Sequence, residues 1–317
     1  MAGMGLTFAS DAASVRTPAT SANLGPGFDA LGLALTLYDD VSARVTDGGF
    51  EVTVSGEGAG ELPVDDRHLV VRAMLATFDE LGERPPGLAV DCVNRIPQAR
   101  GLGSSSAAIV AGVQLARALV KDGFRRLDTD RALGVATRLE GHPDNVAPCL
   151  LGGFTIAWTD GPGARAVRLA PDPAIRPTIF VPAERGYTSA ARQALPPEVP
   201  HADAAFNAGR SALLVHALTA APELLLPATE DRLHQGYRSV GMPGTASLVA
   251  GLRSVGVAAV VSGAGPSVLA LSEVPADFHP GTEWRAETLG VDGAGALVKG
   301  SMVEHAERST VAAGRTS

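Results

Sequence analysis

Lysine is almost absent from this chain of 317 residues, and nearly all of its basic side chains are arginines. Lys121 and Lys299 follow no glycine-rich segment. This excludes a phosphate loop of the Walker type, which places a lysine on the nucleotide phosphates. The formal net charge of -8 and the lack of a basic cluster argue against a nucleic-acid or anionic-membrane surface. Any anionic ligand must therefore be bound at a local site.

Cysteines and long apolar runs are also scarce. Cys92 and Cys149 are too few for a disulfide framework and lie in apolar sequence, so we expect buried free thiols and a reducing compartment. No stretch has the roughly 18 apolar residues of a membrane span, and the N-terminal MAGMGLTFASDAASV lacks the pattern of a secretion signal. The sequence therefore predicts a soluble, cytoplasmic protein, and it leaves a homodimer open.

The size and composition are those of a globular enzyme. A hydrophobic fraction of 45% and a charged fraction of 19% exclude disorder of the whole chain. Because a domain usually has about 100 to 200 residues, 317 residues predict two domains. We place the boundary in the stretch 160–177, which carries proline and glycine, and so predict domains of residues 1–165 and 166–317. A ligand cleft is expected between them.

Hydrophobic periodicity predicts a mixed α/β chain whose ends are poorly ordered. Strands are expected over 15–19, 30–38, 50–55, 87–94, 152–158 and 176–182, and on both sides of a tight turn within 257–271. Helices are expected over 68–81, 109–120, 130–140, 187–195 and 202–218. The segment GHPDN, residues 141–145, is expected to be a compact turn.

The segment GLGSSSA, residues 101–107, is the strongest local signal for a binding site. Gly101 and Gly103 permit backbone amides to approach an anion, and the helix that follows adds unpaired N–H groups and the positive end of its dipole. Serine hydroxyls in this loop could cap the helix or face a magnesium ion. A simple capped turn has the same composition, so the phosphate-site interpretation needs support from elsewhere in the chain.

Two further loops provide that support. SGAGPS, residues 262–267, lies between two apolar runs and is small enough to touch a ligand or the first loop, although a plain hairpin turn would also explain it. PATSANLGPGFDALGLAL, residues 18–35, places Asn23 and Asp29 beside an apolar strand, where a turn alone needs neither side chain.

In content and order these loops resemble those of the GHMP kinases, from about Val15 to Leu271. PQARGLGSSSA is similar to that family's phosphate loop, and VVSGAGPSVLAL to its glycine-rich C-terminal motif. TPATSANLGPGFDALGLAL and EGHPDNVAPCLLGGF are similar to the homoserine kinase branch. The resemblance implies an α+β fold of two domains, ribosomal-protein-like and then ferredoxin-like, with ATP between them. It also implies an ATP- and magnesium-dependent kinase that phosphorylates the side-chain hydroxyl of L-homoserine, in threonine biosynthesis.

The resemblance also implies a role for each site residue. Ser105, with Ser104 and Ser106 as rivals, and Glu140 would bind magnesium through oxygen. Asp144 would accept the hydroxyl proton or orient Asn145. For homoserine, the resemblance implies Asn23 and Asp29 at the ammonium group, His142 and Asn145 at the polar groups, and Arg192 and Arg238 at the carboxylate. The implied ATP contacts are Pro97, Gln98, Ala99, Arg100, Gly101, Leu102, Gly103, Ser104, Ser105, Ser106, Ala107, Gly263 and Gly265.

Two alternatives remain at this point. Another kinase of the family could act on mevalonate or shikimate, which carry a carboxylate but no ammonium group, so Asn23 and Asp29 are the discriminating pair. A catalytically silent nucleotide-binding relative is the other alternative. It would have no physical need for Ser105, Glu140 and Asp144 beside a phosphate loop.

Overall fold

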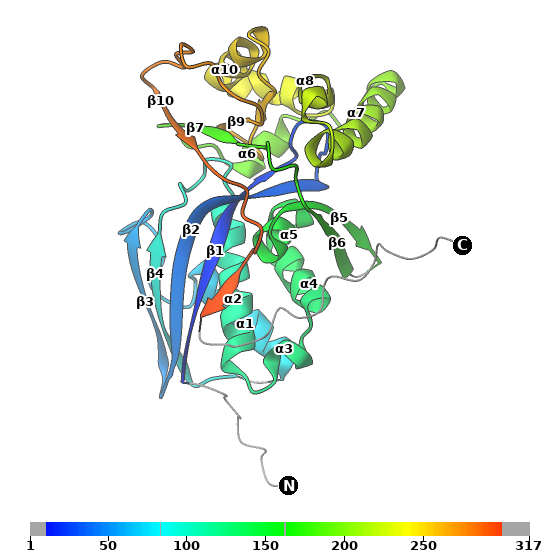
Figure 1. Cartoon of the computed structure of the whole chain (residues 1–317). Coiled ribbons are helices and arrows are strands. Elements are labelled where there is room, and N and C mark those ends of the chain that lie inside the picture. Colours follow the sequence, from blue (N-terminus) through cyan, green and yellow to red (C-terminus); the bar gives the residue numbers. More distant parts are fainter. Residues whose placement is uncertain (1–10, 83, 162, 300–317) are drawn as a thin grey trace, which may run out of the picture.

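The computed structural model describes residues 11–82, 84–161 and 163–299, so most of the expected disorder at the chain ends falls outside the described residues. Within these residues, seven strands form a first sheet, in the order β11-β1-β2-β4-β3, with β5 pairing to β2 and β6 to β5 (Figure 1). The strands are β1 (Ala12–Ala22), β2 (Leu31–Thr46), β3 (Gly49–Gly56), β4 (Gly87–Asn94), β5 (Phe154–Asp160), β6 (Gly163–Leu169) and β11 (Leu297–Lys299).

Helices cover one face of this sheet and enclose the main core (Figure 1). They are α1 (Leu69–Leu81), α2 (Ser104–Leu119), α3 (Gly123–Arg126), α4 (Thr129–Glu140) and α5 (Pro143–Leu151). α1 is capped at its start by His68, whose Nδ1 accepts the N–H of Val70, and at its end by Gly82 in the left-handed conformation. α2 is buried along most of its length, because small residues such as Ala107, Ala111 and Ala116 permit close packing on all sides.

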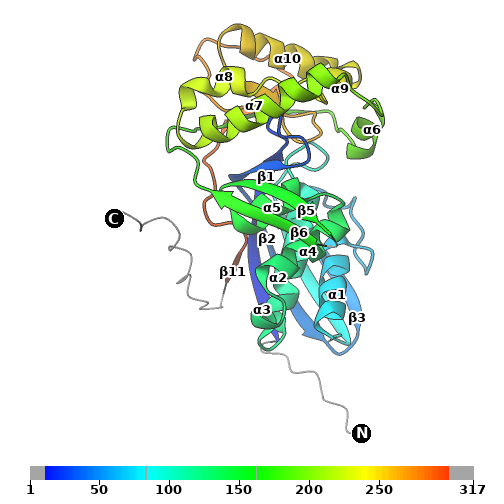
Figure 2. The ribbon, with the colours of Figure 1, turned by 90° about the vertical axis from the view of Figure 1, so that its right-hand side faces the viewer.

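The second half of the described chain builds a smaller sheet. Its described strands lie in the order β10-β7-β9-β8, and comprise β7 (Thr178–Pro182), β8 (Ala259–Val261), β9 (Val268–Ala270) and β10 (Trp284–Thr288). The α-helices are α6 (Thr188–Gln193), α7 (His201–Thr219), α8 (Leu225–Ala228), α9 (Gln235–Arg238) and α10 (Pro243–Ser254), with 3-10 turns at Pro222–Leu224 and Ser239–Gly241. Figure 2 shows α7, α8, α9 and α10 gathered at the end of the molecule opposite α3.

The chain passes from the first sheet to the second between Leu169 and Thr178, within the stretch predicted to hold the boundary. The predicted division between residues 165 and 166 falls inside β6, and β11 returns to pair with β1. Assignment of the two halves as separate domains stays a prediction. No described helix has the length and apolar character needed to cross a membrane.

The predicted strands and helices are confirmed, but β2 continues to Thr46, eight residues beyond the predicted strand, and α2 begins at Ser104, five residues before the predicted helix. The compact turn predicted over 141–145 is wrong. Only Gly141 and His142 form the turn, and α5 begins at Pro143. Proline at the first helical position is favourable, because its missing N–H has no partner there anyway. Pro148 inside the same helix hid it from sequence reasoning, since proline there removes an internal hydrogen bond.

Candidate active site

The phosphate-type loop leads directly into α2, as its sequence predicts. Gly101 and Gly103 have φ of 73° and 70°, in the region that favours glycine. A Cβ on Gly101 would lie 2.1 Å from the carbonyl oxygen of Ser262, and one on Gly103 would lie 1.9 Å from Thr20 Oγ1. Side chains at either position would therefore displace the loop from its neighbours.

The second glycine-rich loop packs directly behind the first. Ser262 Oγ lies 2.6 Å from the carbonyl oxygen of Gly101, and the N–H of Ser267 donates to the carbonyl of Arg100. The N–H of Gly263 in turn donates to the carbonyl of Ala22 in β1. The expected contact between the two loops is confirmed, and it explains why both consist of small residues.

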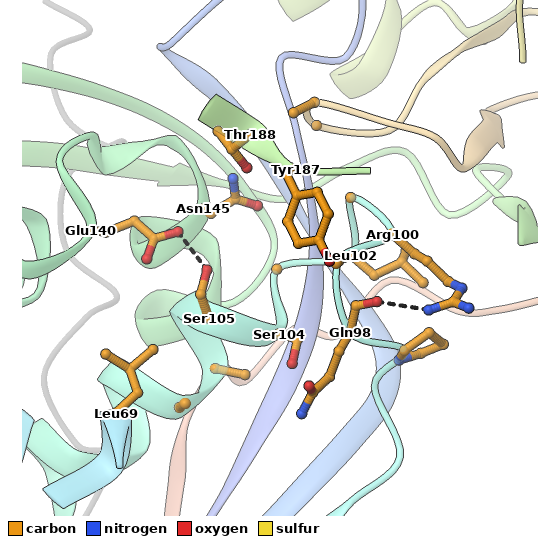
Figure 3. A pocket seen from close by; sticks show the side chains of 18 of the residues that line it. Leu69, Gln98, Arg100, Leu102, Ser104, Ser105, Glu140, Asn145, Tyr187 and Thr188 are labelled. Carbon is orange, nitrogen blue, oxygen red and sulfur yellow. Dashed lines mark hydrogen bonds between the residues drawn. The ribbon is translucent and has the colours of Figure 1, made fainter. Parts of the chain in front are cut away.

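Two of the three serines reach the same carboxylate (Figure 3). Ser105 Oγ donates to Glu140 Oε1 at 2.8 Å, and Ser106 Oγ donates to the same oxygen at 2.9 Å. Ser106 is fully buried, whereas Ser105 is exposed and lines the cavity. Hydroxyl and carboxylate oxygens are ligands that magnesium accepts, and this ion commonly needs only one or two carboxylates beside phosphate and water. Ser105 and Glu140 therefore fit a magnesium–nucleotide complex, although no cluster of three or more His, Cys, Asp or Glu that could hold a metal exists among the described residues.

A second acidic group lies at the start of α5. Asp144 is only 2% exposed, and its Oδ1 lies 2.7 Å from His142 Nδ1. This hydrogen bond is the main cause that raises the pKa of His142. Next to it, Asn145 Oδ1 accepts the Thr20 hydroxyl at 2.8 Å, and among the described residues the amide nitrogen of Asn145 has no hydrogen-bond partner, so it could serve a ligand. His142, Asp144 and Asn145 all line one cavity.

The loop between β1 and β2 carries the predicted ammonium ligands. Asn23 and Asp29 have φ of 68° and 55°, and the Asn23 side chain fixes this conformation. Its Oδ1 accepts the N–H of Asp29, and its Nδ2 donates to the carbonyl of Gly263. Asn23 therefore orients Asp29 and ties the loop to the second glycine-rich turn.

The two predicted carboxylate ligands reach this loop from the second half of the chain. Arg192 on α6 pairs with both oxygens of Asp29, at 2.7 and 3.1 Å. Arg238 on α9 donates to the carbonyl of Ala191, and both guanidinium groups lie over the ring of Phe28. In this structure, Arg192, predicted to bind the substrate carboxylate, is thus paired with Asp29, predicted to bind the substrate ammonium group.

A single cavity of about 400 Å³ joins these loops, and its lining includes Asn23, Asp29, Ser105, Glu140, Asp144, Arg192 and Arg238. Asp29 pairs with Arg192, and Arg192 and Arg238 lie over the same Phe28 ring, so we call these three charged side chains the charged end of the cavity. Apolar residues also line the cavity, namely Val41, Leu62, Pro63, Leu69 and Pro97, together with the polar Asp39, Arg67 and His68. Figure 3 shows the Glu140 side chain directed toward Ser105 of the loop, with Tyr187 and Thr188 also among the labelled residues that line the cavity.

Several predicted ATP contacts have a mainly structural environment. The Arg100 guanidinium donates to the carbonyls of Gln98, Pro182 and Ala183, and so connects the two halves of the chain. Ser106 and Gly265 do not line the cavity, whereas the remaining predicted positions do.

Sequence reasoning missed several lining residues. His68, Tyr187 and Thr188 line the cavity, and Thr20 orients Asn145. Thr20 lies in TPATSAN, part of a segment predicted to contribute to the site, and this position could have identified it. Tyr187 is 65% exposed and precedes the short helix that carries the predicted Arg192, but its own position gave no signal.

Comparison with known proteins agrees with this geometry. The family "GHMP kinases N terminal domain" matches residues 68–153. A homoserine kinase of Streptomyces coelicolor is 56% identical, over 93% of this chain and 96% of that protein. The crystal structure of homoserine kinase from Cytophaga hutchinsonii superposes with a TM-score of 0.77 at 28% identity, covering 92% of this chain and 98% of that one. An L. major mevalonate kinase, 13% identical with a TM-score of 0.59 over 92% of this chain and 99% of that one, shares the fold.

The fold and the phosphate-type loop thus define an ATP-dependent phosphotransferase of the GHMP kinase class, as the loop motifs predicted. Within that class, the chain belongs to the homoserine kinase family.

Proposed function

We propose that this protein transfers the γ-phosphoryl group of ATP to the side-chain hydroxyl of L-homoserine, giving O-phospho-L-homoserine. The observation that carries this proposal is one cavity with a phosphate-type loop beside both anionic and cationic side chains. An amino-acid substrate needs both charges, because it carries an ammonium and a carboxylate group. Mevalonate and shikimate lack the ammonium group and so offer Asp29 no cationic partner on the substrate.

The cavity suggests one orientation for the nucleotide. Its apolar lining residues suit a purine base, and the loop amides of residues 101–106 suit the phosphates. Ser105 and Glu140 would hold a magnesium ion, which lowers the repulsion between phosphate oxygens and a negatively charged environment. The γ-phosphate would then lie near Asp144 and the charged end.

The charged end would hold homoserine by its two ionic groups. Asp29, oriented by Asn23, would accept the ammonium, and Arg192 and Arg238 would donate to the carboxylate. Asp29 and Arg192 pair with each other in the absence of substrate. Binding of homoserine would replace this internal ion pair by two others, one between Asp29 and the ammonium group and one between Arg192 and the carboxylate. His142 and Asn145 would orient the hydroxyl toward the phosphate.

Asp144 is the proposed acceptor of the hydroxyl proton. His142 holds its Oδ1, and within the described residues its Oδ2 has no hydrogen-bond partner. A carboxylate fixed on one oxygen and free on the other suits general-base work at a positioned hydroxyl.

The test is a coupled ADP-release assay on purified protein with magnesium, ATP and a panel of homoserine, serine, threonine, mevalonate and galactose. We expect homoserine to give much the highest kcat/KM. A preference for mevalonate or galactose would contradict the assignment, because neither carries an ammonium group. No ADP release above background with any compound would favour a silent nucleotide-binding relative.

We also propose a reducing, cytoplasmic setting. Cys92 and Cys149 are free and buried, and burial raises the pKa of both thiols. Reaction of native protein with a thiol reagent should be slow, and full reaction after unfolding should give two thiols per chain. Rapid modification of the native protein would contradict the burial.

A further inference from the structure

His234 is a fully buried histidine beside the charged end of the cavity, and it has no role in the chemistry proposed above. It is 0% exposed and precedes α9, which carries Arg238 one helical turn later. Its ring stacks on Phe28 with 5.1 Å between ring centroids. A buried imidazole is costly unless both ring nitrogens are satisfied, so its partners indicate what it does.

Each ring nitrogen has a partner that fixes its protonation. Nε2 lies 2.8 Å from the carbonyl oxygen of Gly25, which can only accept a hydrogen bond. Nδ1 lies 3.1 Å from Nη1 of Arg238, which can only donate. Nε2 must therefore carry the proton and Nδ1 must present a lone pair. His234 is neutral, and its burial, which lowers its pKa, is consistent with that state.

The nearby carboxylate does not change this assignment. The side chain of Asp231 is also buried, and its Oδ2 lies 3.7 Å from Nε2 of His234, too far for a hydrogen bond. Both of its oxygens accept backbone N–H groups at the start of α9, from Leu233, His234 and Gln235. Asp231 therefore holds the backbone of this turn, and the imidazole is left to serve Gly25 and Arg238.

The consequence is a fixed orientation of the Arg238 guanidinium. Nε donates to the carbonyl of Ala191 and Nη1 to His234, with Gly263 O at 3.4 Å. Nη2 is the guanidinium nitrogen without a hydrogen-bond partner in the part of the chain that is described, and Arg238 lines the cavity. Nη2 is therefore the nitrogen left to donate to a ligand.

We propose that neutral His234 is a positioning residue that holds Arg238 so that its Nη2 meets the carboxylate of the amino-acid substrate. This inference rests on the proposed function and names a determinant of substrate binding within it. Through Gly25, the same imidazole also fixes the loop that carries Asp29. One buried side chain thus sets the distance between the ammonium and carboxylate subsites.

Two amide substitutions separate the two hydrogen bonds of His234. His234→Asn places Oδ1 close to the position of Nδ1, and so keeps an acceptor for Arg238. His234→Gln places its amide nitrogen close to the position of Nε2, and so keeps the donor to Gly25 but loses the acceptor. Each variant loses one buried hydrogen bond, so a purely structural role predicts similar stability losses and similar kinetics.

We expect His234→Gln to raise the KM for homoserine about 10-fold or more, with a much smaller effect in His234→Asn. The KM for ATP should change little in either variant. His234→Phe keeps the ring stacked on Phe28 and lacks both nitrogens, so it should raise the homoserine KM at least as much as His234→Gln. It also serves as the second variant should glutamine prevent folding. Circular dichroism and thermal unfolding check that each variant is folded.

The positioning role would be overturned if His234→Asn had the same homoserine KM as His234→Gln or His234→Phe. Loss of ATP binding instead, or failure of all three variants to fold, would also overturn it and leave His234 a structural residue. Wild-type protein that releases no ADP with homoserine would contradict the proposed function itself. An active wild type whose homoserine KM is unchanged by His234→Gln would contradict only the role of His234.

Discussion

Two polar side chains of the site are held by partners that are distant in sequence. Ser105 is bonded to Glu140, and Asn145 to Thr20. Groups that are oriented before the ligand arrives need no reorganisation during phosphoryl transfer, where positioning and electrostatics supply most of the catalysis. Single substitutions at these positions should therefore change kinetics more than folding.

Ser105→Ala tests the magnesium ligand. Ser105 is exposed in the cavity, so its removal should leave the fold intact while turnover falls by about 100-fold or more, a typical loss for one transition-state contact. Ser104→Ala is the neighbouring comparison, because Ser104 has no hydrogen bond to Glu140 among the described contacts. Steady-state kcat at saturating magnesium is the measurement. A larger loss in Ser104→Ala would transfer the role to Ser104, and near-normal turnover in both variants would reject the loop as a metal site.

Asp144→Asn tests the proton acceptor. An amide cannot take the hydroxyl proton, so we expect turnover to fall by about 100-fold or more while the homoserine KM changes little. Since Asp144 raises the pKa of His142, the same variant should lower that pKa, which an NMR titration of the imidazole measures. Turnover within a few-fold of wild type, together with the lowered His142 pKa, would indicate that the bound hydroxyl attacks without a base.

Arg192→Leu and Arg238→Leu test the carboxylate subsite. Each should raise the homoserine KM by tens to thousands of fold, because a desolvated charge pair left half-formed costs of order 2 to 5 kcal/mol. The ATP KM should shift little. Since both groups serve one carboxylate, the double variant should lose less than the sum of the single losses. Arg210→Leu, which removes an ion pair with Glu230 outside the cavity, is the matched control. Arginine variants that lose ATP binding instead would contradict the assignment.

At the scale of elements, a buried carboxylate joins β2 to the segment that follows β4. Asp39 Oδ1 accepts the N–H groups of Arg95 and Ile96, and burial raises the pKa of Asp39 to about 6. In an unfolded chain the value is about 3.9. Folding therefore favours the protonated form of Asp39. The contribution of this group to the free energy of unfolding is fully present below about pH 4 and is lost as the pH rises through 6.

Asp39→Asn keeps the acceptor oxygen and cannot ionise. Relative to wild type, the free energy of unfolding of this variant should therefore increase between pH 4 and pH 7, by up to about 3 kcal/mol. Urea unfolding of both proteins at a series of pH values measures the difference, because the other titrating groups are common to both. A difference that does not change with pH would show that Asp39 is ionised throughout this range in the folded protein.

The elements that sequence reasoning located are those whose signal is local. β4 was predicted from a short apolar run and is found over the predicted residues, and α1 and α2 follow from periodicity with glycine at an end. α5 was missed because Pro148 inside it is a local signal against a helix, which packing in the core overrides.

The site was predictable as a set of motifs, and its pairings were not. Glycine and serine spacing placed the phosphate-type loop, but nothing in the sequence indicated that Arg192 pairs with Asp29 or that Arg100 serves backbone carbonyls. The part played by His234 depends on Gly25 and Arg238, which only the tertiary fold brings to its two ring nitrogens. Such information lies in contacts between distant segments.

At the scale of the whole molecule, the cavity is built from both halves of the chain. The phosphate-type loop, Glu140 and Asp144 belong to the first half, and Arg192, Arg238 and Gly263 to the second. Backbone bonds such as the one from Gly263 to Ala22 keep the halves in register. Neither half alone contains the complete site, so ligand binding must be coupled to the association of both.

This coupling predicts how ligands change the unfolding of the chain. Each ligand that binds only the folded protein should add about 2.7 kcal/mol to the free energy of unfolding at 100 times its dissociation constant. A non-hydrolysable ATP analogue and homoserine should therefore each raise Tm, and both together should move the whole transition by several degrees. Differential scanning calorimetry measures this, with Arg238→Leu as the control that should lose the shift from homoserine and keep the shift from the nucleotide analogue. The contrary result is a separate transition in which one half of the chain unfolds with a midpoint temperature that does not change when both ligands are present. That result would contradict the shared cavity, because this half would then unfold without releasing either ligand.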